Sequence, residues 1–513
     1  MGNILFTNVE LFDGTGRPPF KADVAVKDDK IAAVTDRGAL NKTGSTVVDG
    51  KGMALTPGFI DVHTHSDSSA ALVSGGDSKI SQGVTTDISG NCGLSWYLEG
   101  VQKKEGLKAL YGNFSAYADW VEKSSPTVNT AHLCGHNSLR VKVMGYEQRH
   151  ADKEEIRQMK VLLADALKNG AAGFSAGLFY LPGNFASTEE MKELASLLKG
   201  TGKPYATHVR CEAGKLLESL EEAVEIAKAG DNNLEISHLK TSGVNNWKKL
   251  DEAFAIIENA RNAGMNILAD RYPYIHSATT LRVLVSAPYN VIDTATLCGK
   301  LKESAEFQAE ITALLKKSVP RPLERTLLMN SPIPEHRQYY GMSMVEIGAK
   351  MGCSPEEAVV KLLSSGVSPN AAFGTMCEEN LERILAKPYV ISGSDGNVCS
   401  YDDSGTHPRA FGTFPRFYRI ASKFCDPAAV IRRMTALPAA KFNLESRGII
   451  APGYYADLVL LDLERFSSPA DYAVPNRIAE GVDSVYVNGS LAYSADCSVK
   501  TSRAGRMLRI KSA

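Results

Sequence analysis

Apolar and polar positions in the central part of the chain follow two alternating patterns. Short runs of strand-forming residues end at glycine, proline or polar residues, which is typical of buried strands. Between them lie longer runs at helical spacing; in Ala213–Ala229, Leu216, Leu220 and Val224 share one face, and Gly230 ends the run. The predicted strands are Phe59–His63, Val84–Ile88, Thr130–Leu133, Gly173–Ser175, Tyr205–His208, Leu234–His238, Asn266–Asp270 and Tyr389–Ser392. Eight such units predict an α/β protein with a (β/α)8 TIM-type barrel.

Both ends of the chain carry shorter strand patterns joined by turns. Residues Ile4–Thr56 contain hairpin signals such as Asp13–Gly14, and similar runs return at Asp457–Asp462 and Ser484–Asn488. These patterns predict a small β-sandwich domain built from residues 1–58 and 434–513, with the barrel over residues 59–433. The gap before the last barrel strand is too long for one helix, so we expect a helical insertion around residues 283–366.

Composition and charge exclude several classes of partner. The 513 residues carry a net charge of −1, with 44% hydrophobic and 22% charged residues. This balance is typical of a globular protein and gives no overall attraction to nucleic acid or to an anionic membrane, so we expect neither as a partner. Nine cysteines without a dense framework indicate a reducing compartment. Since no secretory signal and no apolar run of membrane-spanning length is found, we expect a cytoplasmic protein.

The stretch Thr56–His65, TPGFIDVHTH, opens the barrel pattern and carries two histidines. Side chains alternate along a strand, so His63 and His65 are expected to project to the same side. Two imidazoles at this spacing can hold one metal ion. For an isolated pair, two structural histidines are an equally good interpretation, and the choice depends on whether other ligands are present.

Further ligand types stand at the ends of other predicted strands. His208 ends the run YATH, His238 ends LEISH, Asp395 follows YVISGS, and Cys92 lies in SGNCG directly after VTTDI. In barrel enzymes the side chains at the C-terminal strand ends meet at one mouth and carry the chemistry. A purely structural barrel has no reason to gather these residues there, so the pattern predicts a metal-dependent enzyme.

Each residue type suits a part of that chemistry. Cys92, His208 and His238 offer a thiolate and two imidazole nitrogens, which is a three-ligand zinc site with an open fourth position. An open position is typical of a catalytic rather than a structural zinc site, since a water can bind there. The ion lowers the pKa of that water to about 7. The two histidines of the first strand and Asp395 can hold a second ion or flank the water. Asp395 is then the natural general base.

The motifs GFIDVHTH and SGSDG, the strand-end histidines and the segment Arg447–Asp462 resemble the amidohydrolase superfamily. A narrower set of motifs resembles the D-aminoacylase family, the N-acyl-D-amino-acid deacylases. These motifs are SGNCG (Ser89–Gly93), GHNSLR (Gly135–Arg140), FSAGLFYLPG (Phe174–Gly183), THVR (Thr207–Arg210), SHLK (Ser237–Lys240), YPY (Tyr272–Tyr274) and HPRAFGTFPR (His407–Arg416). The match extends over roughly residues 4–490.

This resemblance implies zinc-dependent hydrolysis of the amide bond of an N-acyl-D-amino acid to a carboxylate and a free D-amino acid. It implies one tightly bound zinc ion, with ligands Cys92, His208 and His238. It implies a second, weaker metal position at His63, His65 and Asp395, with Asp395 also the catalytic base. It implies substrate binding by Tyr180, Lys240, Tyr272 and Arg409. An arginine fork and a lysine point charge suit a carboxylate, which agrees with that assignment.

Two other functions compete with this interpretation. A cyclic amidohydrolase or dipeptidase of the same superfamily acts on related amides, and a non-catalytic amidohydrolase-like scaffold works by assembly. Many superfamily relatives bridge two metals with a modified lysine or a glutamate, but Gly170–Leu181 contains neither, so Cys92 is expected to bridge, which favours a deacylase. A scaffold is expected to lose ligands, whereas all six are present. The segment Asn397–Gly405 departs from the family's histidine-bearing loop and is expected to line the side-chain pocket.

Overall fold

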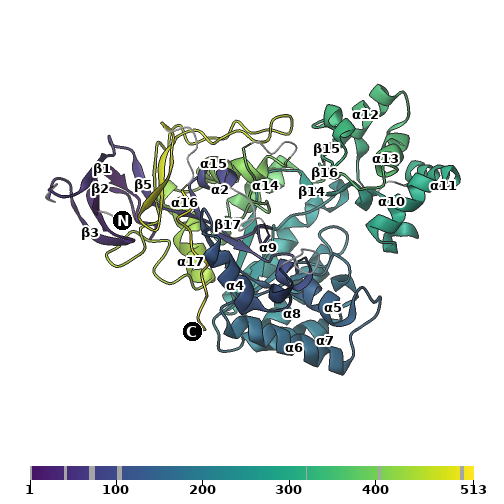
Figure 1. The fold of residues 1–513 in the computed structure, drawn as a ribbon, viewed down its shortest axis with the longest axis horizontal. Coiled ribbons are helices and arrows are strands. Elements are labelled where there is room, and N and C mark those ends of the chain that lie inside the picture. Colours follow the sequence, from purple (N-terminus) through teal and green to yellow (C-terminus); the bar gives the residue numbers. More distant parts are fainter. Residues whose placement is uncertain are drawn as a thin grey trace.

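The computed structural model describes residues 3–39, 43–68, 76–100, 107–318, 321–401, 406–496 and 502–512. Its centre is a closed ring of parallel strands (Figure 1). The ring consists of β6 (Phe59–Asp61), β7 (Val84–Ser89), β8 (Asn129–His132) continued by β9 (Cys134–Gly135), β10 (Phe174–Gly177), β11 (Tyr205–His208), β12 (Asn233–Ile236), β13 (Asn266–Arg271) and β17 (Val390–Ser392). A parallel bridge between Thr64 and Gly396 joins the ends of β6 and β17 and closes the ring. The predicted (β/α)8 barrel is confirmed.

Helices cover the outside of this ring and bury their apolar faces against it. The longer ones are α4 (Phe114–Lys123), α5 (His136–Met144), α6 (Lys153–Lys168), α7 (Thr188–Ala195), α8 (Leu216–Ala229), α9 (Leu250–Asn262), α14 (Glu378–Leu385), α15 (Arg409–Ala421), α16 (Pro427–Met434) and α17 (Ala436–Lys441), and two short ones are α2 (Asp77–Ile80) and α3 (Trp96–Glu99). The start of α6 is fixed by a reciprocal capping box between Asp152 and Glu155. The predicted helical run Ala213–Ala229 corresponds to α8, which begins three residues later, at Leu216, and ends at the same residue.

The two ends of the chain form one hydrogen-bonded sheet beside the barrel. Its strands are β1 (Asn3–Leu11), β2 (Phe20–Lys27), β3 (Lys30–Asp36), β4 (Thr46–Asp49), β5 (Ala54–Pro57), β18 (Leu458–Leu461), β19 (Val482–Val487) and β20 (Ser490–Ser494). The order is β20-β19-β18-β5-β1-β2-β3, with β4 paired to β1. The antiparallel pairing of β18 with β5 joins the two ends. Both ends therefore contribute strands to one sheet.

An insertion between β13 and β17 stands on the opposite side of the barrel from β1–β3 (Figure 1). It contains β14 (Ser277–Thr280), α10 (Thr294–Glu303), α11 (Ala305–Lys317), β15 (Thr326–Asn330), α12 (Met344–Met351), α13 (Pro355–Leu363) and β16 (Asn370–Phe373). The prediction of a helical insertion around 283–366 is incomplete, because the antiparallel sheet β14-β16-β15 belongs to it and widens it to 277–373. Its strands are short, and β14 is partly exposed along its whole length, so the sequence shows no clear strand period.

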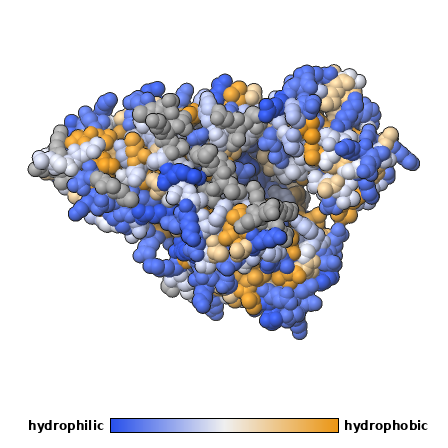
Figure 2. Space-filling view, viewed as in Figure 1, coloured by the Kyte–Doolittle hydropathy of each residue, from blue (hydrophilic) through white to orange (hydrophobic). Residues whose placement is uncertain are grey.

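The insertion has its own apolar core, separate from that of the barrel. Leu301, Ile311, Ile347 and Leu362 are fully buried within it. Figure 2 shows that hydrophilic residues cover much of its outer edge. Among the described residues, no helix combines the length and the apolar character needed to cross a bilayer.

Candidate active site

The predicted ligands of the tight zinc position meet at the mouth of the barrel. Cys92 Sγ lies 3.8 Å from His208 Nδ1 and 3.6 Å from His238 Nε2. All three side chains are buried. Cys92 follows β7, His208 ends β11, and His238 stands two residues beyond β12. The barrel topology therefore brings together three ligands that are 146 residues apart at most.

The spacing of these atoms fits a zinc ion. A tetrahedral ion with Zn–S and Zn–N bonds of standard length holds its ligand atoms about 3.3–3.8 Å apart. The observed separations fall in this range. Burial by itself raises the pKa of the Cys92 thiol, but the charge of His63 and hydrogen bonds to His208 and His238 outweigh burial and hold that pKa well below its usual value. The site thus favours the thiolate, which is the form that binds zinc.

Backbone strain is concentrated on the same residues. Cys92, His238 and Asp395 have φ angles of 52°, 38° and 51°, in the left-handed region that residues with a Cβ rarely adopt. Such conformations cost about 1–3 kcal/mol each and persist where the surrounding structure enforces them. Three strained residues around one point indicate that the fold sacrifices stability to direct these side chains inward.

Gly93, which follows Cys92, has no room for a side chain. Gly93 has a φ of +75°, and a Cβ there would lie 2.1 Å from Asn137 Oδ1 and 2.7 Å from the backbone nitrogen of Gly177. We expect Gly93→Ala to lower the midpoint of thermal unfolding and to reduce the zinc content, because the loop that carries Cys92 must shift. Gly264→Ala is the matched control: its φ is +93° with nothing within 4 Å. The control carries only the backbone cost of about 1–2 kcal/mol. Equal unfolding midpoints and equal zinc contents for the two variants would contradict this prediction.

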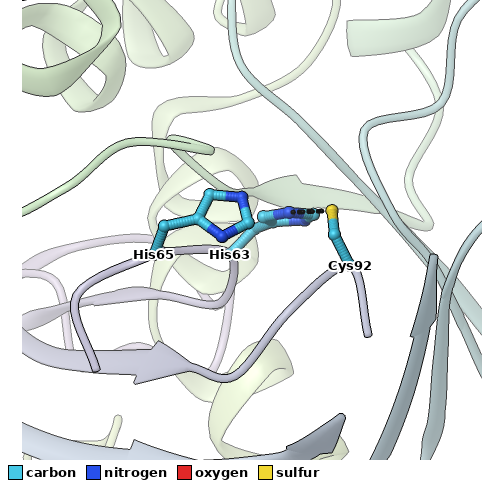
Figure 3. Close-up of side chains that lie close together, drawn as sticks. All are labelled: His63, His65 and Cys92. Carbon is cyan, nitrogen blue, oxygen red and sulfur yellow. Dashed lines mark hydrogen bonds between the residues drawn. The ribbon is translucent and has the colours of Figure 1, made fainter. Parts of the chain in front are cut away.

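The predicted second metal group adjoins the first through His63. His63 Nε2 lies 3.3 Å from Cys92 Sγ and 3.6 Å from Asp395 Oδ1, and His65 Nε2 lies 3.0 Å from the same Asp395 oxygen. Figure 3 shows the His63 ring between the His65 ring and the Cys92 sulfur. Nδ1 of His63 is 2.8 Å from Asp270 Oδ2, which leaves Nε2 facing the cluster. The two ligand groups are therefore continuous, and His63 stands between them.

The prediction that His63 and His65 lie on the first barrel strand is wrong. The structure ends β6 at Asp61, so His63 and His65 lie beyond the strand rather than on it. His63 is fully buried, whereas the side chain of His65 is 28% exposed. Their approach depends on the closure of the ring, where the backbone nitrogen of His65 donates to Gly396 and that of Asp395 donates to His63. Closure with β17 is a tertiary feature that strand alternation does not contain.

Asp395 is held from two sides. Its Oδ2 accepts from Arg409 Nη1 at 2.7 Å, and its Oδ1 faces His65. Burial raises the pKa of this carboxyl, but the Arg409 charge, the hydrogen bond to His65 and the nearby charge of His63 outweigh burial and hold the pKa well below its usual value. The residue is therefore a carboxylate directed at the metal group.

The predicted carboxylate-binding residues are also brought together. The ring centre of Tyr272 lies 5.0 Å from Arg409 Cζ and 5.9 Å from Lys240 Nζ. Tyr272 is fully buried, and no atom of the described residues pairs with its hydroxyl. Tyr180 lies against the metal group, with its ring 4.8 Å from that of His208. Two cations and an unpaired phenol thus surround one point beside the metal ligands.

A cavity of about 210 Å³ opens next to Asp395. The barrel contributes His65, Asp395 and Arg409 to its wall, and the insertion contributes Thr279 and Asn330 among others. The sheet β14-β16-β15 therefore forms part of the wall of this cavity. Residues 397–405 are the segment whose sequence differs from the family's histidine-bearing loop. Asn397 lines this cavity, while residues 402–405 lie outside the described residues.

Sequence reasoning missed two carboxylates. Asp270, in β13, contacts His63 Nδ1 and also accepts from the backbone nitrogen of His238 at 3.0 Å. It ends a predicted strand, so the criterion that found the histidines would have included it. Glu212 lies 3.0 Å from His238 Nδ1 and pairs with Lys240. Its only sequence signal is its position four residues after His208.

Comparison with known proteins shows the family of the chain. The amidohydrolase family model matches residues 46–319 and 344–493. The chain is 34% identical to the D-aminoacylase of Alcaligenes xylosoxydans xylosoxydans, over 95% of this chain and 94% of that protein. It is 31% identical to the N-acyl-D-aspartate deacylase of the same organism, over 96% and 92% of the two chains.

Solved structures of deacylases are also similar to this chain. The N-acyl-D-glutamate deacylase of Bordetella bronchiseptica, complexed with zinc and a phosphonate inhibitor that mimics the tetrahedral intermediate, aligns with a TM-score of 0.82 and 29% identity over 99% of both chains. The fold, the ligand cluster and these matches together define a metal-dependent amide hydrolase. The chain belongs to the amidohydrolase family.

Proposed function

We propose that this protein is a zinc-dependent N-acyl-D-amino-acid deacylase, which hydrolyses the amide to a carboxylate and a free D-amino acid. The observation that carries the proposal is that Asp395 connects the metal group with the carboxylate-binding group. Asp395 faces the metal group and also accepts from Arg409 of the carboxylate-binding group. A substrate whose carboxylate is held near Tyr272 and Arg409 therefore places a nearby amide beside Asp395. The names of the relatives support the same substrate class.

The residues divide the work as follows. Cys92, His208 and His238 hold the zinc ion, and His63, His65 and Asp395 hold the second, weaker position. An ion bound there would supply Lewis acidity for the acyl oxygen and would make a bound water acidic near neutral pH. Asp395 takes a proton from the attacking water and delivers it to the amine, which leaves as the free amino acid.

The substrate carboxylate is held by charge and by hydrogen bonds. Arg409 offers its planar fork, Lys240 a point charge and Tyr272 an unpaired hydroxyl. Tyr180, whose ring packs against that of His208, offers a further hydroxyl for substrate binding beside the metal group. Both cations are already ion-paired, Lys240 with Glu212 and Arg409 with Asp395. The substrate carboxylate therefore joins existing pairs, which limits the gain in affinity and fixes its position.

A cytoplasmic location and the domain limits 1–58, 59–433 and 434–513 are part of the same proposal. No disulfide joins any of the eight cysteines in the described part of the chain, which suits a reducing compartment. The pairing of β18 with β5 supports one unit built from both ends.

The activity assay compares N-acetyl-D-amino acids with their L enantiomers, dipeptides and dihydropyrimidines on zinc-loaded protein. We expect release of free amino acid from at least one N-acetyl-D substrate, and a much lower rate from its L enantiomer. The Asp395→Asn variant, purified in the same way, measures contaminating activity. Turnover of dipeptides or cyclic amides without any N-acyl-D turnover would refute the proposal, as would zinc-loaded protein inactive on all four classes.

A further inference from the structure

Glu212 occupies the point where the outer sides of both zinc-ligand histidines meet. It lies in the loop after β11, with a side chain that is 17% exposed. Its Oε1 is 3.0 Å from His238 Nδ1 and 3.6 Å from His208 Nε2. The opposite nitrogen of each ring, His238 Nε2 and His208 Nδ1, is the one that faces Cys92. One carboxylate oxygen thus faces both rings from the side away from the metal position.

The chemistry of a ligand histidine explains why a carboxylate is needed there. A histidine that binds a metal through one nitrogen carries its proton on the other, and that N–H requires an acceptor. In His208 the outer nitrogen is buried, and no hydrogen bond to it is formed within the described residues; the carboxylate of Glu212 is the nearest ionic partner. For His238, the 3.0 Å separation from Glu212 is within hydrogen-bond range.

Lys240 makes the requirement stronger. Its Nζ lies 2.7 Å from His238 Nδ1 and also pairs with Glu212. An ammonium group only donates, so it cannot serve the N–H of a metal-bound His238. Without a carboxylate between them, two donors would face each other in a buried site, where repulsion is poorly screened. Among the described residues, Glu212 is the group that contacts both His238 and Lys240 and can accept from each.

We propose that Glu212 is a positioning residue, which fixes the proton and the orientation of both zinc-ligand histidines and links them to the carboxylate-binding Lys240. It touches neither substrate nor the reacting atoms. The activity part of the inference rests on the proposed deacylase function, whereas the metal-binding part does not.

A structural ion pair is the competing explanation, in which Glu212 only neutralises Lys240. The two explanations differ in which variants disturb the metal. If Glu212 acts on the histidines, Glu212→Gln weakens zinc binding, and Lys240→Met does so much less. If it only neutralises Lys240, the unpaired ammonium is the cause of any loss, and the double variant Glu212→Gln/Lys240→Met recovers normal zinc affinity.

The experiment measures zinc affinity by chelator competition and records the visible spectrum of the cobalt(II)-substituted protein, without substrate. We expect Glu212→Gln to bind zinc about 10- to 100-fold more weakly, as for other residues that orient metal ligands, and to shift the cobalt bands. The double variant should stay as weak as Glu212→Gln. Glu212→Asp keeps the charge for Lys240 but withdraws the oxygen from the rings, so we expect its zinc affinity to fall as well.

Glu222 provides the matched control. It pairs with Arg210, its side chain is 14% exposed, and it contacts none of the metal ligands. Glu222→Gln should keep the zinc affinity and the cobalt spectrum of the unchanged protein. Wild-type affinity and spectrum in both Glu212→Gln and Glu212→Asp would overturn the inference, and so would recovery in the double variant. If Glu212→Gln fails to fold by circular dichroism, the Glu212→Asp comparison decides. Because these readouts need no substrate, failure of the inference and failure of the deacylase proposal are distinguishable.

Discussion

Replacing Asp395 by asparagine is expected to abolish turnover while zinc stays bound. The amide has nearly the same shape as the carboxylate, so the contact with Arg409 and the bend at this residue can be kept. What is lost is the group that accepts the proton of the attacking water. General bases contribute about 10²- to 10⁴-fold to the rate, and we expect a fall in kcat of that size or larger, because proton delivery to the amine is lost as well. The tight ligands Cys92, His208 and His238 remain in place.

The measurement is kcat on the best N-acetyl-D substrate together with the zinc content after exhaustive dialysis. One tightly bound zinc ion per chain and an unchanged unfolding midpoint would show that the loss is chemical. A variant that retains turnover within about threefold of the original would exclude Asp395 as the base, since such a factor corresponds to less than about 1 kcal/mol.

Replacing Cys92 by alanine is expected to remove the tight zinc ion and, with it, the activity. The thiol lies within 3.3–3.8 Å of His63, His208 and His238 and is the centre of the cluster. Its loss leaves two imidazoles at the tight position, which is fewer ligands than a catalytic zinc site uses. Changes to residues that only orient the ligands lower metal affinity by up to about 100-fold. Because Cys92 is itself a predicted ligand, we expect a larger fall in zinc affinity.

Zinc content after dialysis and activity at rising zinc concentration test this prediction. Cys134→Ala is the matched control, because Cys134 is equally buried and contacts Tyr97 rather than the cluster. The control should keep its zinc and most of its activity. If Cys92→Ala retained one tightly bound zinc ion per chain, the tight site would have to be assigned to other residues.

The strain and the ion pairs of the site serve one purpose. Three inward-directed residues have left-handed backbones, and the two cations that we propose for substrate binding are already paired with Glu212 or Asp395. Such arrangements reduce stability but leave little to reorganise when the substrate arrives. Electrostatic groups that are already oriented are worth more in the transition state than groups that must move.

Local sequence determined much of this protein. Apolar runs fix where the barrel strands and their helices lie, because burial requires apolar side chains at the period of each element. Residue type gave the candidate ligands: a cysteine, histidines and an aspartate after the strands, which a parallel barrel gathers at one mouth. Those inferences depend only on residues close together in the chain and on a fold whose topology is regular.

The tertiary structure alone decided how the ligands are supported. His63 lies between the two ligand groups because the ends of β6 and β17 meet, and Asp270 directs its ring. Glu212, in the loop after β11, faces both His208 and His238. The insertion adds a sheet to the cavity wall. The sequence does not predict this sheet, because its strands are short and β14 is partly exposed. These features depend on contacts between distant segments, and such contacts leave no periodic pattern in the sequence from which they can be predicted.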